Sequence, residues 1–167
     1  TVFGIMQAAE HAYDGEVVVN EALPVRAGDT LKVRMRSNPS FQTSAYRSGE
    51  FQLKYNENNE KIIFSEDIRL IVRHTRDSVG RIEILKTAEG RTHMEARDRA
   101  GDIQYSMNFE NGELQLDGYF TTSMSNQYRD QEVQVIIFLP VGSVLYADDN
   151  TNSYHYNSSY YEDILHD

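Results

Sequence analysis

The fold is read most directly from residues 132–146, EVQVIIFLPVGSVLY. Val133 and Val135 alternate with polar residues, and residues 136–139 are apolar at every position. Successive side chains of a strand point to opposite faces, so this strand is expected to be central in a sheet or covered on both faces. Pro140 cannot donate to a neighbouring strand and should end the pairing, with Gly142 in the turn that follows.

The same order of residues occurs near the start of the chain. Residues 16–25 and 132–141 share a Glu, two Val, a Leu, a Pro and a final Val, and each is followed by a Gly and a new apolar run. The repeated unit is a strand, a proline stop, a glycine turn and a second strand. Chance matching between two β-rich segments is the alternative, because a solenoid needs about three or more copies.

Alternation of apolar and polar residues extends through much of the chain. Such runs occupy residues 31–36, 51–55, 68–73, 82–84 and 103–110. A period of two places one apolar face on a core and one polar face in water. The pattern predicts an all-β domain of antiparallel sheets.

Two turns are marked by their residues. Asn111-Gly112 lies inside an alternating run, and Asn-Gly tolerates the positive φ that both central positions of a tight hairpin require. Residues 56–60, NENNE, indicate a second and looser hairpin loop.

One internal segment is expected to be a short helix. Residues 92–102 lack alternation, Thr92 can cap the N-terminus with Glu95 three residues on, and Gly101 can end the helix. A polar loop is the alternative. Residues 1–13 also look helical, because an apolar start is followed by QAAEHA. We therefore divide the chain into a helical segment, residues 1–14, and a single all-β domain, residues 15–167.

The apolar start of the chain allows two interpretations, the end of a membrane helix or a terminal helix docked on the domain. The first residue is Thr1 and not Met, so we expect additional sequence before it.

Composition excludes several classes of function. The chain has 167 residues, no Cys and a net charge of −10. Without Cys there is no disulfide framework, thiolate nucleophile or Cys-bound metal. The charge opposes binding of nucleic acid. Seven of the acidic residues and no Lys or Arg fall within residues 130–167; this acidic end could attract a cation or a basic partner, or serve as a solvated surface.

Motifs for catalysis or cofactors are absent. The five His show no zinc-ligand spacing, and neither a nucleophile elbow nor a phosphate-binding loop occurs. We therefore expect a non-enzymatic domain without a cofactor, and a hydrolase with dispersed carboxylates is the weaker alternative. Asp148, Asn150 and Asn152 match the start of a calcium loop, but Ser153 and Ser159 replace its Gly and Glu. An Asx-rich turn is favoured there.

Tyrosines gather near the C-terminus in a Ser, Asn and Asp background. They are Tyr146, Tyr154, Tyr156, Tyr160 and Tyr161. A flat apolar face with a hydroxyl suits a sugar or a protein interface, whereas the alternation around His155 suits an edge strand. Residues 157–159 match a glycosylation sequon, which is frequent by chance.

Five segments in this order resemble a known family. They are residues 3–10, 69–73, 111–119, 128–135 and 139–146. The chain resembles the toast-rack β domain at the C-terminal end of envelope-stress membrane proteins of the phage-shock-protein-C type, related to putative adhesin β domains.

The resemblance implies a stacked β assembly, toast-rack or β-solenoid-like, in a membrane-anchored protein of the cell envelope. Residues 1–14 would then be a juxtamembrane helix following a missing membrane region, and the natural protein could continue after Asp167. We expect a periplasmic stress-response domain that senses or binds a protein or surface component, or associates with itself. An adhesin or glycan-binding domain using the five tyrosines is the alternative.

Overall fold

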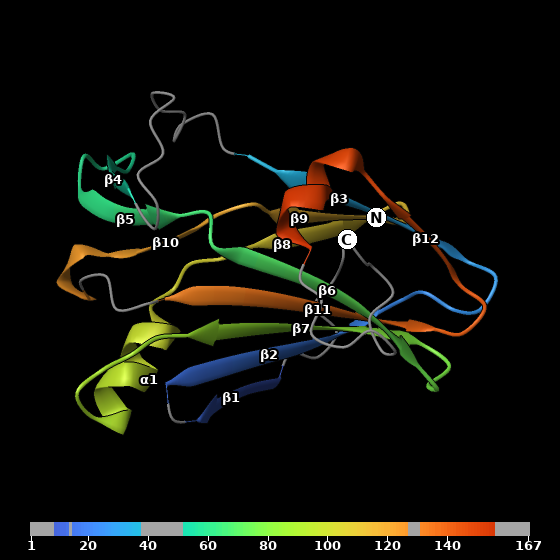
Figure 1. Ribbon diagram of the computed structural model, residues 1–167, viewed down its shortest axis with the longest axis horizontal. Coiled ribbons are helices and arrows are strands. Elements are labelled where there is room, and N and C mark those ends of the chain that lie inside the picture. The colour runs from blue at the N-terminus through green and yellow to red at the C-terminus, as the bar shows by residue number, and fades with distance from the viewer. Residues whose placement is uncertain (1–8, 14, 38–51, 127–130, 156–167) are drawn as a thin grey trace.

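Strands in three sheets make up most of the computed structural model, which describes residues 9–13, 15–37, 52–126 and 131–155 (Figure 1). A five-stranded sheet has the order β1-β2-β7-β11-β6, a four-stranded sheet β12-β3-β9-β8 and a three-stranded sheet β10-β5-β4. The strands are β1 (Ala9–Tyr13), β2 (Glu16–Leu23), β3 (Thr30–Arg36), β4 (Gln52–Tyr55), β5 (Lys61–Ser65), β6 (Ile68–Thr75), β7 (Gly80–Thr87), β8 (Met107–Glu110), β9 (Glu113–Asp117), β10 (Phe120–Ser123), β11 (Glu132–Pro140) and β12 (Val144–Ala147). Three helical segments, α1 (His93–Gly101), η2 (Met124–Asn126) and η3 (Asp149–Tyr154), complete the described elements.

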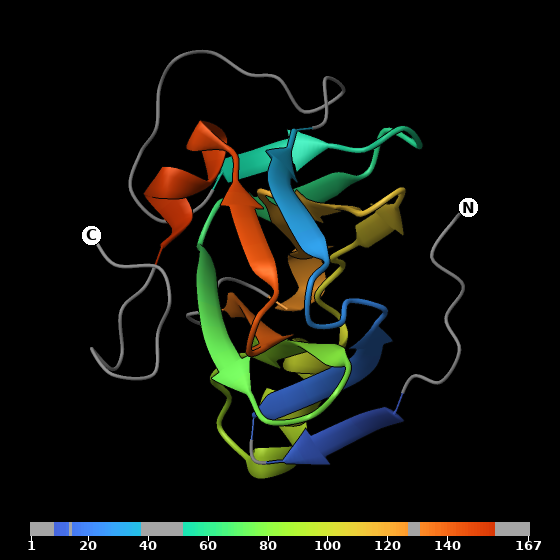
Figure 2. The same cartoon turned by 90° about the vertical axis from the view of Figure 1, so that its right-hand side faces the viewer.

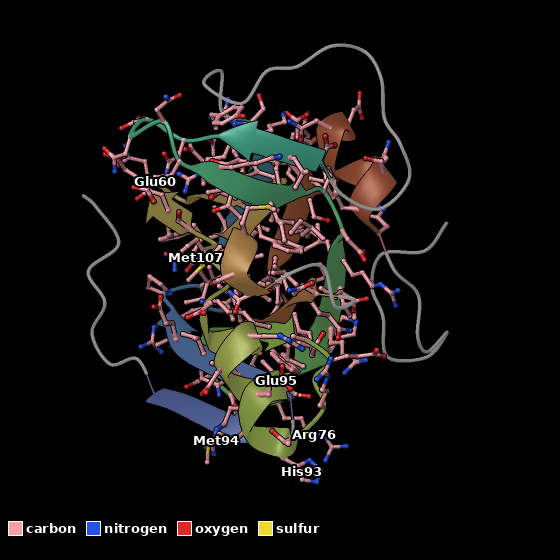
Figure 3. All side chains as sticks on the ribbon, turned by 90° about the vertical axis from the view of Figure 1, so that its left-hand side faces the viewer. Glu60, Arg76, His93, Met94, Glu95 and Met107 are labelled. Atoms are coloured by element: carbon pink, nitrogen blue, oxygen red, sulfur yellow. The ribbon has the colours of Figure 1, made fainter. Side chains whose placement is uncertain are left out.

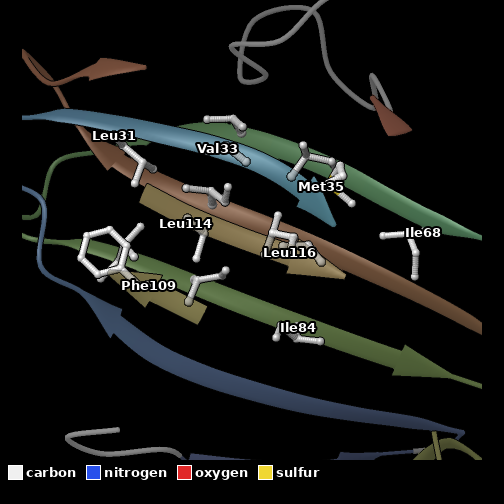
Figure 4. Packing of buried hydrophobic residues seen from close by; sticks show 14 of the residues in the cluster. Leu31, Val33, Met35, Ile68, Ile84, Phe109, Leu114 and Leu116 are labelled. Atoms are coloured by element: carbon white, nitrogen blue, oxygen red, sulfur yellow. The ribbon is translucent and has the colours of Figure 1, made fainter. Parts of the chain in front are cut away.

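The five-stranded and four-stranded sheets enclose the main core. Alternate side chains of β3 and β9, including Leu31, Val33 and Leu114, pack on those of β6, β7 and β11 (Figure 4). The intervening residues of β3 face the opposite side and are exposed or half-buried. The predicted all-β, stacked fold is therefore confirmed, and the two-residue period decides which side chains enter the core.

The strand β11 has the two covered faces that its sequence predicts. It lies between β7 and β6 in the five-stranded sheet. Val135 and Ile137 face the core, while Ile136, between them, is also buried, with 6% of its surface exposed. The strand includes Pro140 and ends there.

The first strands of the two copies of the repeated unit flank β7 in the five-stranded sheet, and their second strands are neighbours in the four-stranded sheet. Both β2 and β11 run antiparallel to β7, and their following strands β3 and β12 pair directly and in parallel, with Val144 opposite Thr30. The Gly28 amide donates to the Gly142 carbonyl at 2.9 Å, which joins the two turns. Both glycines have positive φ, 90° and 93°, which favours glycine at these positions. The repeat is thus structural.

The expectation of purely antiparallel sheets is wrong. The pairs β6–β11, β3–β12 and β3–β9 are parallel. The reason is that the chain crosses from one sheet to the other, as between β2 and β3. Two strands that reach the same sheet by separate crossings of this kind run in the same direction when they become neighbours. The run at residues 103–110 is likewise a strand only from Met107, with an isolated bridge at Gln104.

Both hairpin turns predicted from sequence are confirmed. Asn111 and Gly112 join β8 to β9 with φ of 53° and 76°. The looser loop joins β4 to β5, where the Asn56 side chain accepts hydrogen bonds from the Asn58 and Glu60 amides and Asn59 has a φ of 61°.

The predicted helix is also confirmed, as α1. The Thr92 hydroxyl accepts from the Glu95 amide at 3.1 Å, and the Glu95 carboxylate accepts in return from the Arg91 amide at 2.9 Å. These contacts satisfy free amides of the first turn. The helix covers one end of the five-stranded sheet, far from the β4–β5 loop that carries Glu60 (Figure 3), and Ala100 packs with Val17 of β2.

The helix expected over residues 1–13 is wrong where the structure describes it. Residues 9–13 form β1, which pairs antiparallel with β2 from Ala9 opposite Asn20 to Tyr13 opposite Glu16. The unpaired edge of β2 provides a full set of backbone partners, and this tertiary pairing overrides the weak helical preference of AEHA. Residues 1–8 lie outside the described residues, and the domain division at residue 14 stays a prediction.

Gly90 provides a test of how tightly α1 packs. A Cβ at Gly90 would lie 2.5 Å from the Ala96 backbone nitrogen, whereas a Cβ at Gly101, in the last turn, meets nothing within 4 Å. We expect Gly90→Ala to lower the free energy of unfolding by about 1–3 kcal/mol. Gly101→Ala is the control and should change it by less than about 1 kcal/mol. Urea unfolding measures both, and equal effects would contradict the packing described.

Candidate functional site

The structure separates the tyrosines that the sequence groups. Tyr146 is exposed on β12, whereas Tyr154 is half-buried against the main core and its hydroxyl donates to the Gly118 carbonyl at 3.3 Å. Tyr156, Tyr160 and Tyr161 lie outside the described residues. Tyr154 therefore has a structural role, and a role of the group in binding stays a prediction.

The segment that resembles a calcium loop is an Asx turn that closes a sheet edge. The Asp148 side chain caps η3 by accepting from the Asn150 amide. The Asn150 side chain accepts from the Met35 amide at 3.1 Å and donates to the Met35 carbonyl at 2.8 Å. Since β12 pairs with β3 only as far as Val33, Asn150 replaces the missing strand at Met35.

A polar cluster lies next to this turn, where β3 and β9 end. Asp117, mostly buried, accepts from the Arg36 side chain at 2.5 Å and from the amide and hydroxyl of Ser106. The Tyr105 hydroxyl is buried without a hydrogen-bond partner, and burial, reinforced by the charge of Asp117, raises the Tyr105 pKa well above its usual value. Because every polar contact of Asp117 links β3, β9 and the segment before β8, the cluster holds the sheet end together.

Other ionisable groups with shifted pKa values are also built into the sheets. Burial lowers the pKa of Lys54, against the opposing charge of Glu66, and its ammonium lies 3.8 Å from the centre of the Phe64 ring. Burial raises the pKa of Glu132, which pairs with Arg69 at 3.1 Å. Among the described residues, no three His, Asp or Glu side chains converge as a metal site requires.

Glu21 is the carboxylate least suited to its surroundings. It lies on β2 opposite Ile82, with 8% of its surface exposed, and its Oε2 has no hydrogen-bond partner. Burial raises its pKa. A buried, unpartnered carboxylate destabilises the fold when it ionises.

An exposed apolar patch lies along β12. We call Val141, Val144 and Tyr146 the β12 edge patch; their exposed fractions are 67%, 53% and 62%. Figure 2 shows β12 beside β3, and within the described strands β12 ends the four-stranded sheet. Residues 141–147 carry no charge. Sequence analysis missed Val141 and Val144, although this uncharged run in an acidic part of the chain was a signal for them.

Sheet edges are normally protected by charge, proline or a covering segment. The first two are absent from β12 itself, and the patch places two apolar side chains on its outward face. Such an edge can accept an extended strand through its backbone. The β12 edge patch is therefore the candidate site.

Comparison with known proteins identifies one family. A family model described as the ToastRack found in some PspC matches residues 54–167. No curated protein matches the chain. No solved structure matches it either. Within the part of the chain that the structure describes, no helix has the length and hydropathy that crossing a bilayer requires.

The Asn150 contacts predict a loss of stability on a minimal change. Asn150→Asp keeps the acceptor for the Met35 amide but sets a carboxylate oxygen against the Met35 carbonyl. We expect the free energy of unfolding to fall by about 1–3 kcal/mol. Asn152→Asp, which makes the same change at an exposed position, should have little effect. Equal urea midpoints for the two variants would contradict this role of Asn150.

Glu21 predicts a pH dependence with a definite sign. Its pKa is raised in the folded state, so its contribution to stability is fully present below about pH 4.5, the ordinary value, and is lost as pH rises through the folded-state pKa. Glu21→Gln should therefore be more stable than the natural chain at pH 7, and this advantage should shrink below pH 4.5. Thermal unfolding between pH 4 and 8 measures it, with exposed Glu110→Gln as the control. A constant difference across pH would exclude the ionisation of Glu21 as its cause.

Proposed function

The chain belongs to the family of ToastRack domains found in some PspC proteins, and on this premise we propose that it is a non-enzymatic binding domain of a cell-envelope stress-response protein. Membership supports a membrane-associated stress-response context. The toast-rack β domain is a non-catalytic type of fold. The finer statement, that the domain binds a protein or surface component on the periplasmic side of a membrane-anchored protein, is our proposal.

The observation that carries the proposal is the β12 edge patch. An exposed strand edge with two apolar side chains on one face and no charge offers backbone hydrogen bonds and apolar area to a partner. Three of the four described ionisable groups with shifted pKa values, all except Glu21, have structural explanations instead. Lys54 lies over Phe64, Glu132 pairs with Arg69, and the Tyr105 hydroxyl is buried next to Asp117. These roles support binding over catalysis.

Glycan binding is a second candidate, favoured by one observation. The ring of Tyr146 is exposed, and an aromatic face can stack on a sugar. A glycan array separates the candidates, because a sugar site at Tyr146 gives a signal that Tyr146→Ala abolishes. Absence of any signal would argue against it.

The proposed function predicts that one charge on β12 abolishes signalling. Val144→Lys in the full-length membrane protein places an ammonium within the β12 edge patch, which blocks strand addition and apolar contact. We expect loss of an envelope-stress reporter response, with protein abundance and melting temperature unchanged because Val144 is exposed. The matched control is Leu53→Lys, at the exposed edge of β4, which should respond normally.

A full reporter response from Val144→Lys at normal abundance would refute the proposed site. A similar loss in both variants would refute it as well, because the effect would then not depend on β12. Protease protection of the domain in intact cells, lost when the outer barrier is opened, tests the periplasmic location separately.

A further inference from the structure

We propose that the partner of the β12 edge patch is a second copy of this chain. The two β12 strands would pair antiparallel about a two-fold axis at Leu145, so that the two four-stranded sheets become one continuous sheet. This inference rests on the proposed function, since it names the occupant of the same surface. Three observations support it: the direction of the backbone groups, the side chains that lie on the same face of β12, and the absence of charge along the edge. The small area of the edge sets the expected strength of the contact.

The outer side of β12 presents backbone amides and carbonyls that no described strand pairs with. The Val144 amide donates to the Asp29 carbonyl at 2.8 Å and the Asp148 amide to the Val33 carbonyl at 2.9 Å, so the even-numbered residues face β3. In a strand, the amides and carbonyls of alternate residues point to opposite sides. Those of Leu145 and Ala147 therefore point away from β3, where no described strand pairs with them.

A second copy matches these groups. With the axis at Leu145, the two Leu145 residues exchange a pair of amide-to-carbonyl hydrogen bonds. Each Ala147 amide faces the Ser143 carbonyl of the other copy. The Ser143 amide already donates to Pro140 within its own chain, at 3.1 Å, so it is not left without a partner. The pairing thus satisfies both backbone groups of Leu145 and the amide of Ala147, and it leaves the Ala147 carbonyl to water.

In this register the exposed side chains of one copy are complementary to those of the other copy. Residues opposite each other in an antiparallel pair lie on the same face of the sheet. Val144 then faces Tyr146 of the second copy, and Tyr146 faces Val144, on the outward side. A β-branched residue opposite an aromatic one is a favourable cross-strand pair, and the two-fold axis makes it twice.

The absence of charge along the edge permits a second copy as the occupant. In a chain of net charge −10, a contact between copies must avoid acid against acid, and residues 141–147 carry no charge. With the axis at Leu145, Asp148 falls opposite Gly142. An axis at Tyr146 is excluded by the backbone, because the amide and carbonyl of Tyr146 point to β3 and cannot pair with a second copy. The uncharged edge therefore admits a second copy in the Leu145 register without repulsion.

The small area of the contact fixes its strength. A four-residue strand edge with two exposed apolar side chains, together with Val141 just before it, is well short of the roughly 1,200–2,000 Å² that a stable interface buries. The pair should therefore be weak in dilute solution. Copies held on one membrane reach effective concentrations on the order of 1 mM, at which a weak contact becomes populated.

Cysteine cross-linking tests both pairing and register, because the chain has no Cys of its own. Val144 and Tyr146 of opposing copies form a pair without mutual hydrogen bonds, whose Cα atoms lie about 4.5 Å apart, a separation that a disulfide spans. We expect a mixture of Val144→Cys and Tyr146→Cys chains at about 1 mM to give at least tenfold more linked dimer than either variant alone. A mixture of Leu53→Cys and Tyr55→Cys, also two exposed residues on an edge strand, is the matched control and should link no faster than its single variants.

Two cross-linking results would overturn the inference. One is linkage of Tyr146→Cys alone above the mixture, which would place the axis elsewhere. The other is no linkage above the Leu53 and Tyr55 control. Sedimentation equilibrium of the unmodified chain keeps the test valid if a cysteine variant fails to fold. We expect association at about 1 mM that Val144→Lys weakens at least tenfold, and a monomer at that concentration would also overturn the inference.

The outcomes separate this inference from the proposed function. If Val144→Lys loses the stress response while the natural chain stays monomeric, the patch binds a different protein and only the second copy is excluded. If the chain pairs through β12 but Val144→Lys signals normally, the pairing stands and the proposed function fails.

Discussion

The parallel pairing of β3 with β12 is the constraint on which the rest of this structure depends. It joins the second strand of one repeat to that of the other within one sheet, and the hydrogen bond from the Gly28 amide to the Gly142 carbonyl links the two turns that precede these strands. This pairing sets the direction in which β11 enters the five-stranded sheet. It also brings η3 to the end of β3, where Asn150 bonds to Met35 in place of the strand that β12 is too short to supply, and Tyr154 bonds to Gly118 after β9.

A short β12 has two consequences for function. Its inner side is paired with β3, and its end leads into the Asx turn, where Asn150 bonds to Met35. On its outer side, next to Val144 and Tyr146, the backbone groups pair with none of the strands that the structure describes. Pairing with β3 already fixes the conformation of β12, so strand addition to its outer side carries no entropic cost of ordering β12 itself.

Some features were predictable because their causes lie within a few residues. The turn at Asn111-Gly112 follows from its tolerance of positive φ, and α1 from the reciprocal caps of Thr92 and Glu95. The two-faced apolar run of β11 predicted a covered strand, and Ile136 is covered. The helix expected over residues 1–13 is wrong at residues 9–13, because the local preference was weak and β2 offered an unpaired edge.

The amino-acid sequence alone determined the all-β class, the repeated strand–proline–glycine–strand unit and the family, because period, turn chemistry and residue order are properties of the chain itself. Only the tertiary structure decided which strands are neighbours, which edge stays open, and that Tyr146 is exposed while Tyr154 is packed on the core. The physical reason is that exposure at a sheet edge depends on strands far apart in sequence. The residues of an edge strand do not by themselves indicate which distant strand will pair with it.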